Sequence, residues 1–284
     1  MKIKCILCSL LVWISVENHT QAQIKTPNTE TLKAFSSSKT YIVLEDVMFS
    51  DFNINIEEAA QQHWKITPFE IISLRQFENQ CKIPQASFLM VVIGEYTGGF
   101  AKNTAFNMLT LMMGHKSGDV NKMPEILSIP LSYYLPDGDE EDYGYKLGGI
   151  LEGLQYAVKN ILPQKITMTN FKAIFNNYSA EVKTKELWVT KNDLSLSVNT
   201  LEKIKSIYPY KVTITSEQAI QQAIDEKQNN VAFLHKVGNS NVHNATCFKL
   251  IINCADGKLL YGDYHSISTK EPNGLLPKDF KALQ

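Results

Sequence analysis

Apolar residues recur along the chain in short runs, and the same order of runs occurs twice. In the N-terminal part, the order strand, helix, strand, helix, strand is predicted at residues 40–45, 56–63, 64–67, 69–79 and 87–93. In the C-terminal part, the same order is predicted at residues 187–190, 199–207, 210–214, 216–227 and 231–237. This alternation predicts parallel strands joined by right-handed crossovers.

Each part then changes to an antiparallel pattern and ends in a helix. Strands at 105–113 and 126–134 precede a helix at 143–161 in the first part. In the second part, strands at 246–254 and 259–265 flank an Asp256-Gly257 turn, which is typical of a hairpin, and a helix follows at 277–283. Each half is therefore expected to contain a mixed sheet.

Short sequence matches support an internal duplication. Residues 64–67 (WKIT) resemble 210–213 (YKVT), and residues 88–92 (FLMVV) resemble 233–237 (FLHKV). The predicted fold is therefore α/β with an α+β tendency, in two duplicated domains at residues 23–163 and 186–284. The polar linker at 164–185 contains Phe171, Ile174 and Phe175, which indicate a short helix within it.

The N-terminal segment has the layout of a secretory signal peptide. A basic start is followed by an apolar stretch at residues 5–16 and by small residues before a cleavage site at Ala22. A membrane anchor is the alternative, but twelve apolar helical residues cover only about 18 Å of a hydrocarbon layer about 30 Å thick. We expect a signal peptide at residues 1–22 and a periplasmic or secreted mature chain without a membrane span.

Charge and cysteine content restrict the partners and the disulfides. A net charge of -1, with Arg75 as the single arginine, gives no electrostatic support for a nucleic-acid partner. Removal of the signal peptide leaves Cys81, Cys247 and Cys254. Because Cys247 and Cys254 are an odd number of residues apart, one strand would point them to opposite faces. Buried free thiols are therefore expected.

The second hairpin carries the candidate catalytic residues. A two-residue turn at Asp256-Gly257 would pair residue 254 with 259, 250 with 263 and 248 with 265. Asp263 and His265 would then share a face, where they could orient a base or hold a metal ion. The simpler explanation is a hydrogen-bonded polar pair near the sheet edge. The same register separates His265 from Cys247, which makes a thiol–imidazole dyad geometrically poor.

Two loops and one helix carry further candidates. The glycine-rich loop after the strand at 87–93 is a candidate ligand or partner loop, because such loops follow the carboxyl ends of parallel strands; it comprises Gly94, Glu95, Tyr96, Thr97, Gly98 and Gly99. No nucleotide motif occurs, and we predict no cofactor.

The acidic run contains the metal-ligand candidates Asp137, Asp139 and Glu141, although charge compensation at the start of the following helix is a simpler explanation. Glycines recur through that helix and predict close packing against a sheet; they are Gly144, Gly148, Gly149 and Gly153.

The signal peptide, the composition rich in Lys, Asn and Ile, residues 55–64 (NIEEAAQQHW) before a strand, and the duplicated plan resemble uncharacterised exported proteins of the Bacteroidota. The resemblance implies an envelope or periplasmic location and supplies no reaction. We expect a non-catalytic module that binds an envelope protein or a small ligand. The alternative is a secreted hydrolase with a spatially assembled site. A deep polar cleft would favour the enzyme, whereas an exposed apolar patch or an open sheet edge would favour the binding module.

Overall fold

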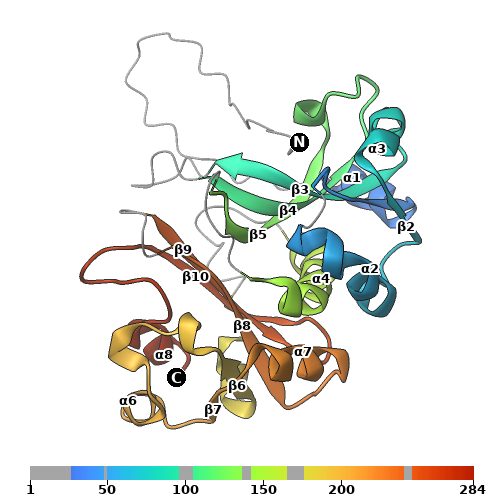
Figure 1. Cartoon of the computed structure of the whole chain (residues 1–284). Helices are drawn as coiled ribbons and strands as arrows, with labels where there is room; N and C mark the ends of the chain where they lie inside the picture. The colour runs from blue at the N-terminus through green and yellow to red at the C-terminus, as the bar shows by residue number, and fades with distance from the viewer. Residues whose placement is uncertain (1–26, 48–49, 96–104, 136–141, 165–175, 240–244) are drawn as a thin grey trace, which may run out of the picture.

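Two mixed five-stranded sheets with the same strand order form the protein (Figure 1). The computed structural model describes residues 27–47, 50–95, 105–135, 142–164, 176–239 and 245–284. The first sheet has the order β2-β1-β3-β4-β5, with strands β1 Thr40–Val43, β2 Phe69–Ile72, β3 Ser87–Glu95, β4 Ala105–Met113 and β5 Glu125–Tyr133. The second has the equivalent order β7-β6-β8-β9-β10, with strands β6 Glu186–Val189, β7 Val212–Ile214, β8 Val231–Val237, β9 Thr246–Asn253 and β10 Leu259–Ser266. The predicted α/β fold with two similar sheet units is confirmed.

The helices cover the sheets on both faces. The first helix in the described part of the chain is α1 Thr29–Ser36, and the crossover helices are α2 Asp51–His63, α3 Leu74–Gln80, α6 Leu201–Lys205 and α7 Glu217–Asp225. Parallel strands in the order 2-1-3 require the two right-handed crossovers to lie on opposite faces. Accordingly, Ile56 of α2 and Phe77 of α3 belong to different apolar clusters, as do Ile204 of α6 and Ile224 of α7.

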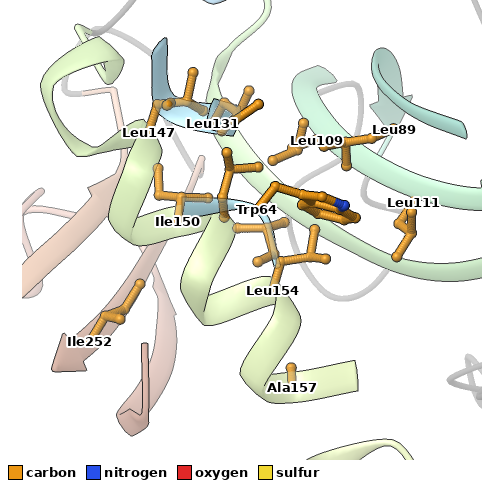
Figure 2. Close-up of a cluster of buried hydrophobic side chains, with 14 of the residues drawn as sticks. Trp64, Leu89, Leu109, Leu111, Leu131, Leu147, Ile150, Leu154, Ala157 and Ile252 are labelled. Carbon is orange, nitrogen blue, oxygen red and sulfur yellow. The ribbon is translucent and has the colours of Figure 1, made fainter. Parts of the chain in front are cut away.

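A closing helix follows each hairpin, and the first of them joins the two halves. The segment begins with a 3₁₀ turn at Gly144–Lys146, forms α4 Leu147–Tyr156, and continues as a π-helical turn at Ala157–Ile161. In Figure 2, Ile150 and Leu154 face Trp64 and side chains from the first sheet, while Ile252 of β9 lies on the other side of the helix. The second closing helix, α8 Pro277–Ala282, packs Phe280 against the opposite face of the second sheet.

The main apolar core is therefore shared between the halves. Its buried residues come from α2, β3, β4 and α4 of the first half and from α7, β8 and β9 of the second. The glycines of α4 permit the close packing expected from their spacing. A Cβ atom at Gly149 would lie 2.4 Å from Phe233 Cζ, and one at Gly153 would lie 3.2 Å from Ile252 Cδ1. The domain boundary within residues 164–185 stays a prediction, and Phe171, Ile174 and Phe175 lie outside the described residues.

The predicted strand at 64–67 and helix at 69–79 are wrong. Residues 64–67 form a turn in which Trp64 is buried and its Nε1 donates to Thr67 Oγ1 at 3.0 Å. The strand starts after Pro68, where Phe69 pairs with Thr40 of β1. Helix α3 begins only after Ser73, because the Ser73 and Gln76 side chains form a capping box. A strand and a capped helix thus occupy the range in which apolar spacing predicted one helix.

The predicted register of the second hairpin is also wrong by one residue. Gly257 adopts a positive φ of 68°, and Asn253 N–H donates to Lys258 O at 3.0 Å, so the loop is longer than the expected two residues. An irregularity between Leu259 and Tyr261 inserts one residue into β10. Asp263 consequently pairs with Lys249, and His265 pairs with Cys247. A one-residue shift exchanges the two faces of a strand, so His265 lies on the same face as Cys247.

Candidate functional site

Asp263 and His265 lie in a polar group beneath α8, in which Asp263 is half-buried and the other members are buried; we call this group the α8 cluster. Its members are Lys249, Tyr261, Asp263, His265 and Asp279. Strand alternation puts Tyr261, Asp263 and His265 on one face of β10, and cross-strand pairing adds Lys249 of β9. Pro277 at the first turn of α8 fixes the start of the helix, which brings Asp279 over that face.

The His265 ring is held by the backbone rather than by Asp263. Its Nε2 donates to Pro272 O at 3.0 Å, and its buried Nδ1 has no hydrogen-bond partner among the described residues. Burial lowers the pKa of His265, and the neighbouring charge of Lys249 lowers it further. The neutral ring could act as a base, but it lies under the loop that carries Pro272. The catalytic assignment of Asp263 and His265 stays a prediction.

Cys247 faces His265 across the hairpin, contrary to the sequence expectation. Its side chain is fully buried, so the facing thiol and imidazole do not present an open surface to a substrate. Cys81, Cys247 and Cys254 are all buried free thiols, as expected. Burial raises the pKa of Cys254 to about 12, with a smaller contribution from Glu152.

Lys249 and Asp279 form the most deeply buried ion pair in the described part of the chain. Lys249 Nζ lies 2.7 Å and 2.8 Å from the two carboxyl oxygens of Asp279, and both side chains are 0% exposed. Asp279 also accepts from Leu276 N at 2.7 Å and from Tyr261 Oη at 3.1 Å. The Tyr261 hydroxyl lies 3.4 Å from Asp263 Oδ2 as well, so it connects the two carboxyl groups.

A second polar group, in which His63 and Glu152 are buried and Asp225 and Lys227 are exposed, joins α2, α4 and α7, and sequence reasoning missed it. We call it the interhelical cluster: His63, Glu152, Asp225 and Lys227. His63 Nδ1 lies 2.9 Å from Glu152 Oε1, and His63 Nε2 lies 3.1 Å from Asp225 Oδ1. Each ring nitrogen of His63 therefore lies within hydrogen-bonding distance of a carboxylate oxygen. The sequence feature that could have revealed this cluster is Glu152, the one charged residue within the apolar helix α4.

The other predicted site residues fall largely outside the described part of the chain. Gly94 and Glu95 form the end of β3, whereas Tyr96, Thr97, Gly98 and Gly99 lie outside the described residues. Asp137, Asp139 and Glu141 also lie outside them. Among the described residues, no group of three or more His, Cys, Asp or Glu side chains is arranged to hold a metal ion.

A groove of about 260 Å³ is lined by residues of α6, β6 and β7, and we call it the β7 groove. Its lining combines the first residue of β6, the helix α6, the edge strand β7 and the turn between α6 and β7: Glu186, Leu201, Ile204, Lys205, Pro209, Tyr210, Lys211, Val212 and Thr213. Leu201 is 39% exposed and Tyr210 is 38% exposed. Leu196, on the 3₁₀ turn just before α6, is 79% exposed.

The backbone of β7 is open on the side away from β6. Leu187 N–H donates to Lys211 O, and Thr215 N–H donates to Val189 O, so residues 211 and 215 face β6. Alternation along a parallel ladder then directs the N–H and C=O groups of Val212 and Ile214 outward. β7 is the terminal strand of its sheet among the described residues, and Val212 is also one of the residues that line the groove. The site can therefore bind an extended segment through backbone hydrogen bonds and apolar contacts.

Comparison with known proteins gave no relative: no family model, no curated protein and no solved structure matches this chain.

Proposed function

We propose that the protein is an exported, non-catalytic binding module and that the β7 groove is its contact surface for a partner protein. The observation that carries this proposal is that β7 is a terminal strand of its sheet and that a groove lined partly by β7 also exposes Leu201 and Tyr210. An open edge and an apolar patch are the features that distinguish a binding module from an enzyme in this fold.

The size of the groove favours a polypeptide over a small molecule. Small-molecule sites usually enclose about 300 to 1,000 Å³ and bury most of the ligand surface. The β7 groove is about 260 Å³ and borders a strand edge, so it has room for one or two side chains of a longer segment. An extended segment added to β7 would pair with Val212 and Ile214 and place alternate side chains against Leu201 and Tyr210.

Charges around the groove indicate the chemistry of that segment. Lys205 and Lys211 line it, and Lys183 Nζ lies 5.8 Å from the centre of the Tyr210 ring. Glu186 also lines the groove, but its carboxylate accepts a hydrogen bond from Thr213 Oγ1. Three lysines at the rim favour acidic side chains on the partner and discourage pairing of β7 with the same edge of a second copy. The partner is thus an envelope protein with an acidic extended segment.

The test is capture of partners from the native envelope with tagged mature protein, followed by mass spectrometry. The wild type should retain a stoichiometric partner that Val212→Pro and Leu201→Ser lose by at least tenfold. Proline suits position 212 because the outward N–H is needed only for strand addition. Ile54→Ser is the matched control, since Ile54 is an exposed apolar residue on α2 of the first half. Equal capture by wild type and both groove variants would overturn the assignment of the groove.

Export is tested separately. The described residues contain no helix with the length and apolarity needed to cross a membrane. If residues 1–22 are a signal peptide, protein from the periplasmic fraction or medium should begin at Gln23. A cytoplasmic protein that retains Met1 would contradict export without bearing on the groove.

A further inference from the structure

The carboxyl ends of β6 and β8 form the topological switch point of the second sheet. In the order β7-β6-β8, the chain leaves β6 over one face of the sheet and returns from β7 to β8 over the other. Open α/β sheets bind their ligands in the crevice outside such strand ends. Trp188 of β6 pairs with Phe233 of β8, so Thr190 and His235, two residues further along, lie close together on the same face.

Polar side chains from both halves converge on this point, and we call them the switch-point cluster. Tyr145 and Lys146 come from the 3₁₀ turn before α4, and Glu217 comes from the first turn of α7, which packs against that 3₁₀ turn. Asp193, just beyond β6, accepts from Thr190 N at 2.8 Å and from Thr190 Oγ1 at 2.9 Å. The cluster comprises Tyr145, Lys146, Thr190, Asp193, Glu217 and His235.

Two members of the cluster are buried without hydrogen-bond partners among the described residues. Lys146 is 3% exposed, and its Nζ lies 4.8 Å from the centre of the Tyr145 ring but forms no ion pair or hydrogen bond there. Its positive charge is close enough to act on both Glu217 and His235. His235 is 2% exposed; its Nε2 contacts Pro130 O at 2.7 Å, and its Nδ1 has no partner. Native proteins seldom leave buried polar groups of this kind unpaired.

The equivalent position in the first sheet is apolar. There Tyr41 of β1 pairs with Phe88 of β3 on the face that carries α3. Two residues further along these strands lie Val43 and Met90, and both are buried in an apolar cluster. The sheet therefore folds without polar side chains at this point, and their presence in the second half is not a requirement of the architecture.

The charges at the switch point are of both signs. Lys146 supplies a buried positive charge, whereas Glu217 is half-buried and Asp142 beside it is exposed, so the acidic side faces solvent. Burial raises the pKa of Glu217, the charge of Asp142 raises it further, and the charge of Lys146 opposes both. Lys146 thus compensates only part of the negative charge, and a ligand that brings one charge of each sign satisfies both sides.

We propose that the switch-point cluster binds a small zwitterion of the α-amino acid class. The carboxylate of the ligand accepts hydrogen bonds from Lys146 Nζ in the buried part of the site. The ammonium group of the ligand lies towards the carboxyl groups of Glu217 and Asp142 and donates to the Nδ1 acceptor of His235. This small-molecule site is separate from the β7 groove, since none of its residues lines that groove.

Thermal unfolding of the mature protein with free amino acids tests the proposal. Each proteinogenic L-amino acid is added at about 10 mM, and at least one should raise the Tm by about 3 °C or more. Acetate and methylamine are the matched probes, because each carries only one of the two charges, and neither should reproduce the shift. The absence of a shift with every amino acid would overturn the proposal, and an equal shift with acetate alone would show an adventitious ion only.

Variants identify the binding groups. Lys146→Met should abolish the shift and raise the Tm of the ligand-free protein, because it removes a buried charge that has no acceptor. A lower Tm of this ligand-free variant would give Lys146 a structural role and contradict the site. The exposed Lys159 on the same helical segment provides the control Lys159→Met, which should keep the shift.

Glu217→Gln changes a half-buried side chain and tests the acidic side of the site independently of Lys146. It should weaken the apparent affinity for the amino acid by about tenfold, because a charge-assisted contact is lost. Glu202→Gln, at the corresponding first turn of α6, should leave the affinity unchanged. Wild-type affinity in Glu217→Gln would contradict the placement of the ammonium group.

Discussion

Gly149 of α4 lies directly against the ring of Phe233 of β8, and this contact sets how closely the two halves approach. A Cβ atom at position 149 would be 2.4 Å from Phe233 Cζ and 2.6 Å from Cε1. Gly149→Ala should therefore reduce the free energy of unfolding by about 1 to 3 kcal/mol, although alanine favours a helix by up to about 1 kcal/mol. Equilibrium urea unfolding measures this loss.

Gly153→Ala is the matched control on the same helix. A Cβ atom there would meet Ile252 Cδ1 at 3.2 Å and Leu259 Cδ2 at 3.3 Å, the movable ends of two aliphatic side chains. The gain in helix propensity should roughly offset this tighter packing, which leaves the stability within about 1 kcal/mol of the wild type. Equal destabilisation by the two substitutions would show that close approach at Gly149 is not what joins the halves.

The succession of strands and helices along the chain was largely predictable because each half repeats a strong local signal. Buried apolar runs such as β3 and β8 stand out against the helices that precede them, and Pro277 correctly marked the start of α8. The short strand β2 was missed because Phe69–Ile72 is apolar enough to continue a helical pattern. Only the capping box at Ser73 separates the two elements, and it was not recognised.

The site was less predictable because its geometry depends on one inserted residue. The bulge after Leu259 places His265 opposite Cys247 and Asp263 opposite Lys249. No local pattern in the hairpin sequence predicts this bulge. Asp279 and Lys249 meet through tertiary packing of α8, and His63 meets Glu152 across 89 residues. Apolar periodicity overestimates the lengths of β7 and α6. The sequence pattern therefore does not reveal the β7 groove, which these two short elements line.

Acid should destabilise the protein through His235. Burial lowers the pKa of His235 to about 3, the charge of Lys146 lowers it further, and Nε2 makes a 2.7 Å contact with Pro130 O. The native ring is thus neutral, whereas the unfolded chain binds a proton below about pH 6.5. The contribution of His235 to the free energy of unfolding is therefore fully present above about pH 6.5, and it is lost as the pH falls from about 6.5 towards 3.

His235→Leu isolates this contribution. Between pH 7 and pH 5, the wild type should lose about 2 kcal/mol more of its unfolding free energy than the variant loses. Urea unfolding at several pH values gives both slopes, and their difference is independent of the constant cost of the lost contact with Pro130. His265, whose pKa is also lowered, acts in the same direction in both proteins. Parallel slopes for wild type and variant would contradict a neutral buried His235.

Glu152 should hold the halves together through the interhelical cluster. Its Oε1 accepts from His63 Nδ1 at 2.9 Å and from Lys227 Nζ at 2.8 Å, and the Glu152 side chain is nearly buried. Because hydrogen bonds to a buried charge are the stronger kind, Glu152→Gln should cost about 2 to 3 kcal/mol of unfolding free energy.

Asp225→Asn tests whether the loss of stability depends on burial of the carboxylate or only on its contact with His63. Asp225 makes a 3.1 Å contact to the same ring, but its side chain is 39% exposed, so solvent screens the interaction and the cost should stay below about 1 kcal/mol. A double-mutant cycle between His63→Gln and Glu152→Gln then measures their coupling directly by urea unfolding. If Asp225→Asn costs as much as Glu152→Gln, or if the cycle gives no coupling, His63 is not stabilised chiefly by the buried carboxylate of α4.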